Sequence, residues 1–237
     1  MSYRHPSNVA NAQPKRVTHG TVTMATKLRR RNKRFYRVLF TVFILVTFKV
    51  VKDTLNMATV EVREVDKAIR KLQEIGINLL AIDFDQTIID IHTGGRWKKT
   101  MDELKIHVRP QFRELLTASI EHDIHVAVVT FSKQPTLIKE ILETIVGIEN
   151  AARIPVRGND HSWQYHGVGS RHGKQAHIAS AVEELEQSGE VEITKKTTLL
   201  IDDDDRNIRH ALRDGTRGIL FNPNKPGNLM GDLANLV

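Results

Sequence analysis

The chain has 237 residues, 40% hydrophobic and 27% charged, which excludes a fibrous or wholly disordered protein. It contains no cysteine, which excludes disulfides, thiolate metal sites and cysteine nucleophiles. The formal charge of +7 divides unevenly, because residues 1–56 hold 12 basic residues and one acid, giving +11, whereas residues 57–237 carry −4. We therefore predict a basic, partly disordered extension over residues 1–56 and a domain over residues 57–237 that folds alone and has no broad nucleic-acid surface.

The extension contains a basic run, Lys27–Arg34, and then an apolar run of 11 residues, Val38–Phe48. A membrane-spanning helix needs about 20 apolar residues, so this run would span only if the flanking basic side chains extended to the membrane surface. Three interpretations stay open: a single-pass membrane anchor through residues 35–51, an organelle-targeting segment, and an extension outside the working protein. We expect the domain itself to reside in the cytoplasm, since the lack of cysteine fits a reducing compartment.

The remaining sequence alternates two patterns. Apolar residues at helical spacing predict helices, and short β-branched runs predict buried strands. The predicted helices cover residues 61–75, 110–121, 132–145, 174–187 and a stretch ending near 212, and the predicted strands cover residues 78–84, 124–130, 152–156, 197–201 and 218–221. Strands that alternate with helices form parallel sheets with right-handed crossovers. We therefore predict an α/β fold, a Rossmann-like parallel sheet in three layers with helices on both faces.

Polar side chains follow the predicted strands at the point where each strand ends. Asp83 and Asp85 lie at the end of the first strand, Thr130 ends the second, and four aspartates at 202–205 follow a third. Lys174 begins a predicted helix. Open α/β sheets hold their ligands at the carboxyl ends of the strands. Because carboxylates close together repel one another, ionising them all requires a cation between them.

These motifs, in this order, resemble those of the haloacid dehalogenase (HAD) superfamily of aspartate-nucleophile phosphotransferases. The resemblance covers residues 77–221, and its first and last motifs are the specific ones. Asp-Phe-Asp-Gln-Thr at 83–87 is similar to the first family motif, Val-Val-Thr at 128–130 to the second, Gly-Lys at 173–174 to the third and Ile-Asp-Asp-Asp-Asp-Arg-Asn at 201–207 to the fourth. The intervals between motifs are too short for a large cap domain, so the resemblance implies a HAD-like domain of the cap-poor type.

The resemblance also implies catalytic roles. Asp83 would attack phosphorus and form an aspartyl-phosphate, and Asp85 would protonate the leaving oxygen and later activate water. Thr130 would hold the phosphoryl oxygens, and Lys174 would balance the charge on the phosphate and the nucleophile.

A metal site is implied as well. Mg²⁺ would lie between Asp83, the Asp85 carbonyl and Asp203, where it neutralises charge in the transition state. Asp202 would either support these ligands from behind or replace Asp203 as a ligand, and Asn207 would position the lysine. The last two acids of the run receive no role.

Asp85 distinguishes branches of the family, because the dehalogenases and the transport ATPases lack an acid there. The resemblance therefore favours a phosphomonoester hydrolase, and the lack of a cap favours a bulky or macromolecular phosphate, with protein, nucleic-acid end and small molecule left open. Two loops offer substrate-binding candidates, Arg96 with Trp97 and Trp163 with His166. The alternative function is a catalytically inactive HAD-like binding module tethered to a membrane.

Overall fold

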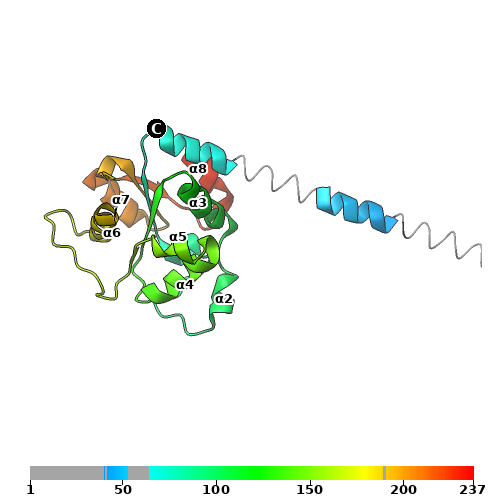
Figure 1. Ribbon diagram of the computed structural model, residues 1–237, viewed down its shortest axis with the longest axis horizontal. Helices are drawn as coiled ribbons and strands as arrows, with labels where there is room; N and C mark the ends of the chain where they lie inside the picture. The colour runs from blue at the N-terminus through cyan, green and yellow to red at the C-terminus, as the bar shows by residue number, and fades with distance from the viewer. Residues whose placement is uncertain (1–39, 41, 53–63, 189–190) are drawn as a thin grey trace, which may run out of the picture. The chain divides into compact units, whose positions relative to one another are not determined.

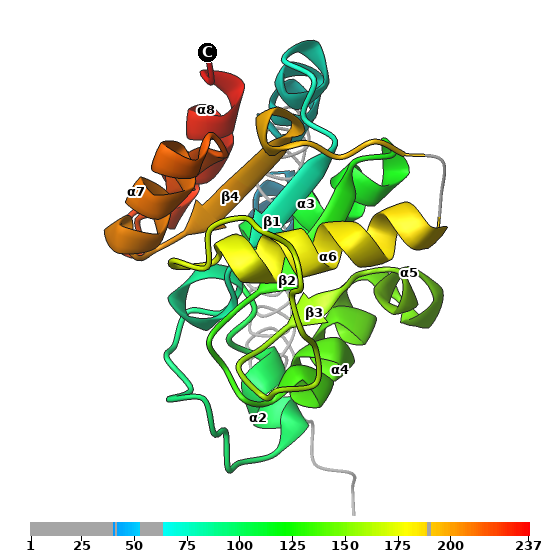
Figure 2. The ribbon, with the colours of Figure 1, turned by 90° about the vertical axis from the view of Figure 1, so that its left-hand side faces the viewer.

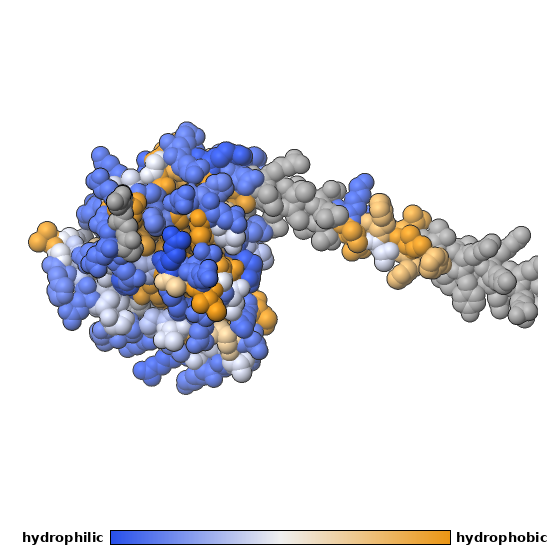
Figure 3. Space-filling view, viewed as in Figure 1, coloured by the Kyte–Doolittle hydropathy of each residue, from blue (hydrophilic) through white to orange (hydrophobic). Residues whose placement is uncertain are grey.

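The computed structural model describes residues 40, 42–52, 64–188 and 191–237. The chain divides into two compact units, Met1–Met57 and Ala58–Val237. In the first unit, residues 42–52 form a helix with exposed apolar side chains, coloured orange in Figure 3. No helix in the described part of the chain is long and apolar enough to cross a membrane. The predictions for residues 1–39 and 61–63 lie outside the described residues.

Five parallel strands of the second unit form one sheet in the order β3-β2-β1-β4-β5 (Figure 2). Their bounds are Leu79–Ile82 for β1, His125–Val129 for β2, Val156–Arg157 for β3, Thr198–Asp202 for β4 and Arg217–Leu220 for β5. The central strand is β1, where Ile82 pairs with Val128 of β2 on one side and with Ile201 of β4 on the other. The predicted parallel α/β sheet is confirmed.

Helices connect the strands, as Figure 1 shows. Residues 64–74 are helical and precede β1. The labelled helices are α2 (Met101–Lys105), α3 (Pro110–Glu121), α4 (Pro135–Val146), α5 (Ile148–Ala152), α6 (Gln175–Ser188), α7 (Asp205–Asp214) and α8 (Leu229–Ala234), and the short turns are η1 (Phe84–Ile88), η2 (Lys195–Thr197) and η3 (Pro226–Asn228). Among the described residues no separate domain is inserted between the strands, so the carboxyl edge of the sheet carries only loops and short helices.

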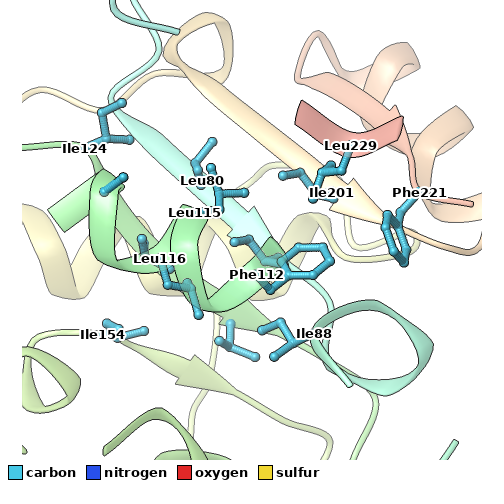
Figure 4. Close-up of a cluster of buried hydrophobic side chains, with 14 of the residues drawn as sticks. Leu80, Ile88, Phe112, Leu115, Leu116, Ile124, Ile154, Ile201, Phe221 and Leu229 are labelled. Atoms are coloured by element: carbon cyan, nitrogen blue, oxygen red, sulfur yellow. The ribbon is translucent and has the colours of Figure 1, made fainter. Parts of the chain in front are cut away.

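The two faces of the sheet bury different side chains, because successive strand residues point to opposite faces. On one face Leu80 and Ile201 pack with Phe112 and Leu115 of α3 and Leu229 of α8 (Figure 4). The other face, which α6 crosses in Figure 2, has one alanine in each of β1 and β2 among larger apolar side chains. The alanines there are Ala81 and Ala127. Small side chains let α6 pack closely, and this brings the start of α6 to the strand ends.

Four short elements, β3, α5, α2 and α8, differ from the sequence prediction. Residues 152–156 were expected as one strand, but α5 ends at Ala152 and β3 spans two residues. Helices α2 and α8 were not predicted, because five and six residues make too few turns for a helical period to show. For α2 the sequence does carry a local signal, since Thr100 and Glu103 form a capping box.

Candidate active site

The strand ends surround a cleft of about 420 Å³. Asp83 directly follows β1, Thr130 directly follows β2, and Asp202 is the last residue of β4. Since Ile82 pairs with both neighbouring strands, the residues after it meet those of β2 and β4 at one edge. All four predicted catalytic residues line this cleft, which brings Asp85 and Lys174 to the same place.

A buried ion pair forms the bottom of the cleft. Lys174 Nζ donates to Asp83 Oδ1 at 2.6 Å and to the carbonyl of Val129 at 2.9 Å, and it lies 4.1 Å from the ring centroid of Phe131. Lys174 is 1% exposed and Asp83 is 7% exposed. A lysine is buried this far only when its charge is paired, because desolvating a free ammonium is costly. The Lys174 position is therefore tied to Asp83.

Gly173 allows the lysine to reach this place. Its φ is 58°, and a Cβ there would lie 3.2 Å from Asn207 Oδ1 and 3.3 Å from His210 Cβ. Glycine adopts positive φ readily and leaves room for the approach of α7. The Gly-Lys pair seen in the sequence therefore has a steric reason in the fold.

Three carboxylates gather beside the ion pair. Asp83, Asp202 and Asp203 each offer one oxygen, and these oxygens lie within 4.8 Å of one another. Burial, followed by the charge of Asp83, raises the pKa of Asp202 to about 7 and also raises the pKa of Asp203. Lys174 balances one of the three charges when all are ionised, which leaves a charge that one divalent cation would balance. Donors that are all oxygen suit Mg²⁺ or Ca²⁺, so these residues fit such an ion.

Asp202, at the end of β4, is more firmly held than Asp203, which follows it. Asn207 Nδ2 donates to both of its oxygens at 3.1 and 3.0 Å, and the Asp204 N–H donates to Oδ1 at 2.8 Å. Asp203 accepts from the hydroxyl of Thr87 at 3.4 Å. The choice between Asp202 and Asp203 as the direct ligand stays open, because both lie in the cluster.

Asn207 was expected to position Lys174. In the described chain no hydrogen bond joins the two side chains, and the amide nitrogen of Asn207 is engaged with Asp202. Its Oδ1 faces Gly173 instead. Asn207 thus orients an acid of the cluster and packs against the residue before the lysine.

Asp85 faces a different wall of the cleft. Its two oxygens accept from the Thr93 hydroxyl, both at 2.9 Å, and Oδ2 lies 3.1 Å from His92 Nδ1. Burial raises the pKa of Asp85, which helps a carboxyl hold a proton for donation. The chain turns sharply directly after Asp85, where Gln86 has a φ of 59°. A non-glycine residue in this region is strained, and such strain is common where the backbone shapes a site.

Sequence reasoning missed Thr93, His92 and Ser132 as parts of the site. Ser132 is 5% exposed and lines the cleft, and its N–H donates to the Thr130 hydroxyl at 3.2 Å. The Ser132 hydroxyl, two residues beyond Thr130, was a usable signal. The contacts of Thr93 and His92 depend on how their loop folds back, and no local pattern indicates that.

The four predicted substrate-binding residues do not all lie at the cleft. Arg96 lines the cleft, and the other three do not. The indole N–H of Trp97 donates to the Thr100 carbonyl at 3.0 Å, and that of Trp163 donates to the Gly158 carbonyl at 2.7 Å. His166 is exposed on its loop. Both tryptophans therefore hold loops together.

No protein-family model and no curated protein matches the chain. Three solved structures resemble it distantly. An uncharacterized protein from Corynebacterium glutamicum has 18% identity and a TM-score of 0.41, with 68% of this chain and 98% of that chain covered. The N-terminal part of a Bacteroides fragilis protein, containing a phosphatase domain and complexed with Mg, has 15% identity and a TM-score of 0.47, with 72% and 43% covered. A predicted HAD-like family hydrolase from Porphyromonas gingivalis has 11% identity and a TM-score of 0.36, with 61% and 90% covered.

Proposed function

We propose that this chain is a Mg²⁺-dependent phosphomonoester hydrolase of the HAD type that works through an aspartyl-phosphate on Asp83. The observation that carries the proposal is the buried contact of Lys174 with Asp83 beside two further carboxylates. A site built only to bind a cation gains nothing from a buried ammonium next to one of its ligands. A site that transfers a phosphoryl group needs both, because the ammonium balances charge on the nucleophile and on the phosphoryl oxygens.

The first chemical step uses the residues around the ion pair. A carboxylate oxygen of Asp83 attacks phosphorus, and the bond between phosphorus and the ester oxygen breaks. Asp85 gives its proton to the departing oxygen, which suits its raised pKa. The hydroxyl of Thr130 and the ammonium of Lys174 hold the phosphoryl oxygens at the bottom of the cleft.

The second step returns the enzyme to its starting state. Asp85, now ionised, takes a proton from a water molecule as that water attacks the phosphorus of the aspartyl-phosphate. The bond between phosphorus and the Asp83 oxygen breaks, inorganic phosphate leaves, and Asp83 is again a carboxylate. One residue thus acts as acid and then as base.

Asp83, Asp202 and Asp203 would hold the cation, together with the Asp85 carbonyl that the family resemblance adds. When bound, Mg²⁺ supplies neutralisation of the charge that develops on the phosphoryl group. The cleft is open, with no inserted domain above it in the described chain, and this favours a bulky phosphate ester as substrate. Arg96 on the rim is available to contact it.

The test is hydrolysis of p-nitrophenyl phosphate by the full chain. We expect turnover with Mg²⁺, none with a chelator, and a loss of at least about 10⁴-fold in the Asp83→Asn variant, since removing a nucleophile disables the whole unit. The matched control is Asp205→Asn, which removes an exposed acid that pairs with Arg209. Unchanged turnover in Asp83→Asn would contradict the mechanism. Mg²⁺ binding without turnover of any ester would favour the binding module instead.

A further inference from the structure

Two separate segments of the cleft wall are fastened to each other. The backbone N–H of Trp97 donates to Gln134 Oε1, and Gln134 Nε2 donates to the Trp97 carbonyl at 3.3 Å. The backbones also approach each other two residues before Trp97, because a Cβ on Gly95 would lie 3.8 Å from the backbone nitrogen of Lys133. The loop after η1 and the segment after β2 therefore run side by side at the rim.

This fastening places two cationic residues on neighbouring segments of the rim. Arg96 lies between Gly95 and Trp97, Lys133 lies just before Gln134, and both residues line the cleft and are exposed. Within the described chain neither cation has a carboxylate in ion-pair distance, whereas the nearby Lys99 contacts Glu103 at 3.8 Å. Two cations on neighbouring segments, neither with a counter-charge, suit an anion that both side chains contact.

The two cations are separate from the groups that serve the transferred phosphate. That phosphate is held by Thr130 and Lys174 at the bottom, whereas Arg96 and Lys133 lie on the rim. Phe131 lies next to Thr130 in the chain and is 49% exposed in the cleft. Its ring is fixed by the Lys174 ammonium and by an edge contact with His177 at 5.4 Å. The rim thus offers an apolar surface and two cations to the part of the substrate that leaves.

We propose that Arg96 and Lys133 form a second anion subsite, and that the preferred substrates are phosphomonoesters whose leaving group carries a further carboxylate or phosphate. This inference rests on the proposed function, because it names the substrate class of the same site. The leaving group packs on Phe131, and its anion lies between the guanidinium of Arg96 and the ammonium of Lys133.

Three aryl phosphates test the subsite with the full chain and Mg²⁺. They carry a carboxylate, a phosphonate or a neutral carboxamide at the 3-position, so they have closely similar rings and differ in charge. We expect kcat/KM for both charged esters to exceed that for the carboxamide by about 3- to 10-fold at low salt, the range for two exposed charge contacts. The phosphonate arm distinguishes a preference for phosphate from one for carboxylate. The preference should shrink as salt is added.

Substitutions test whether Arg96 and Lys133 cause the preference for charged esters. In Arg96→Gln combined with Lys133→Gln, the ratio of charged to neutral ester should fall to about 1. Lys98→Gln is the matched control, because Lys98 is an exposed cation two residues from Arg96 that does not line the cleft, and it should keep the ratio.

Other outcomes overturn the subsite. Equal kcat/KM for the three esters, or a ratio that survives the double substitution, refutes it while hydrolysis itself continues. If the double substitution lowers kcat/KM equally for all three esters, the two cations act on the transferred phosphate, and the subsite is also refuted. If no ester is hydrolysed, the proposed function fails and the subsite with it, so the two failures differ in what is measured.

Discussion

The four consecutive aspartates at 202–205 lie in two different environments. Asp202 is 1% exposed and Asp203 is half-buried, and both lie beside Asp83. Burial raises the pKa of both carboxyls, so each is costly to ionise without a cation. These two acids store electrostatic repulsion that a bound cation would relieve.

The next two acids have cationic partners, and Asp204 is half-buried at the cleft whereas Asp205 is exposed. Asp204 accepts from the Arg206 N–H at 2.9 Å as the cap of α7, and its contact with the Arg206 side chain lowers its pKa. Asp205 pairs with Arg209 one turn along the helix. The chain leaves the strand at this point, so adjacent residues of one type divide between a site and a helix start. An acidic run is therefore not one functional unit.

The largest expected difference between the two pairs is in turnover. Asp203→Asn should lower kcat/KM for p-nitrophenyl phosphate by about 10³-fold or more, because charge neutralisation at the phosphoryl group contributes several kcal/mol. Asp205→Asn should change it by less than about 2-fold, since an exposed ion pair contributes little. Steady-state kinetics at saturating Mg²⁺ measures both. A similar loss in the two variants would show that the run acts as a unit.

His177 is also a buried titratable group, but in the described chain it has no hydrogen-bond partner. It is 8% exposed between Phe131 and Trp163, and neither ring nitrogen has a hydrogen bond in the described chain. Burial lowers its pKa to about 4 from the usual 6.5. Below pH 6.5 this histidine is protonated in the unfolded chain, but in the folded chain it stays neutral until about pH 4. The unfolded state therefore binds more protons in this window, and the free energy of unfolding falls by about 3 kcal/mol between pH 6.5 and pH 4.

Replacing His177 with phenylalanine should flatten this part of the pH dependence and keep the aromatic contacts. Urea unfolding at several pH values between 4 and 7 measures it, because the midpoint follows stability when the slope is constant. His166→Gln removes an exposed histidine and should leave the dependence as it is. The prediction is wrong if His177→Phe loses stability with acid as steeply as the unsubstituted chain.

The smallest expected effect is the loss of stability when Asp204 or Asp205 is replaced. Asp204→Ala removes the cap of α7 and should cost about 1 kcal/mol of unfolding free energy. Denaturant unfolding measures this loss, and Asp205→Ala should cost less than half as much. A loss of turnover in Asp204→Ala without a change in Mg²⁺ affinity would show that Asp204 acts in the reaction, which contradicts its assignment as a helix cap.

Local sequence patterns were sufficient to predict a parallel sheet and the residues at the ends of β1, β2 and β4. A short apolar run that ends in an acid or a hydroxyl can be recognised within a few residues of sequence. Because parallel strands place such ends at one edge of the sheet, the positions of Asp83, Thr130 and Asp202 could be predicted. The contacts of Asp85 with Thr93, and of Gln134 with Trp97, join segments whose meeting depends on tertiary packing. No period or motif indicates such contacts. The sequence therefore locates the bottom of the cleft better than its rim.

The central claim is that Asp83 carries the phosphoryl group. The Asp85→Asn variant should accumulate this species with p-nitrophenyl phosphate, because nitrophenolate leaves without a proton while attack by water lacks its base. Borohydride reduces an acyl phosphate to the alcohol, so peptide mass spectrometry should find homoserine in place of Asp83 after substrate and not before. Homoserine at another aspartate, or turnover by the unsubstituted chain with no trapped product in either protein, would contradict the account.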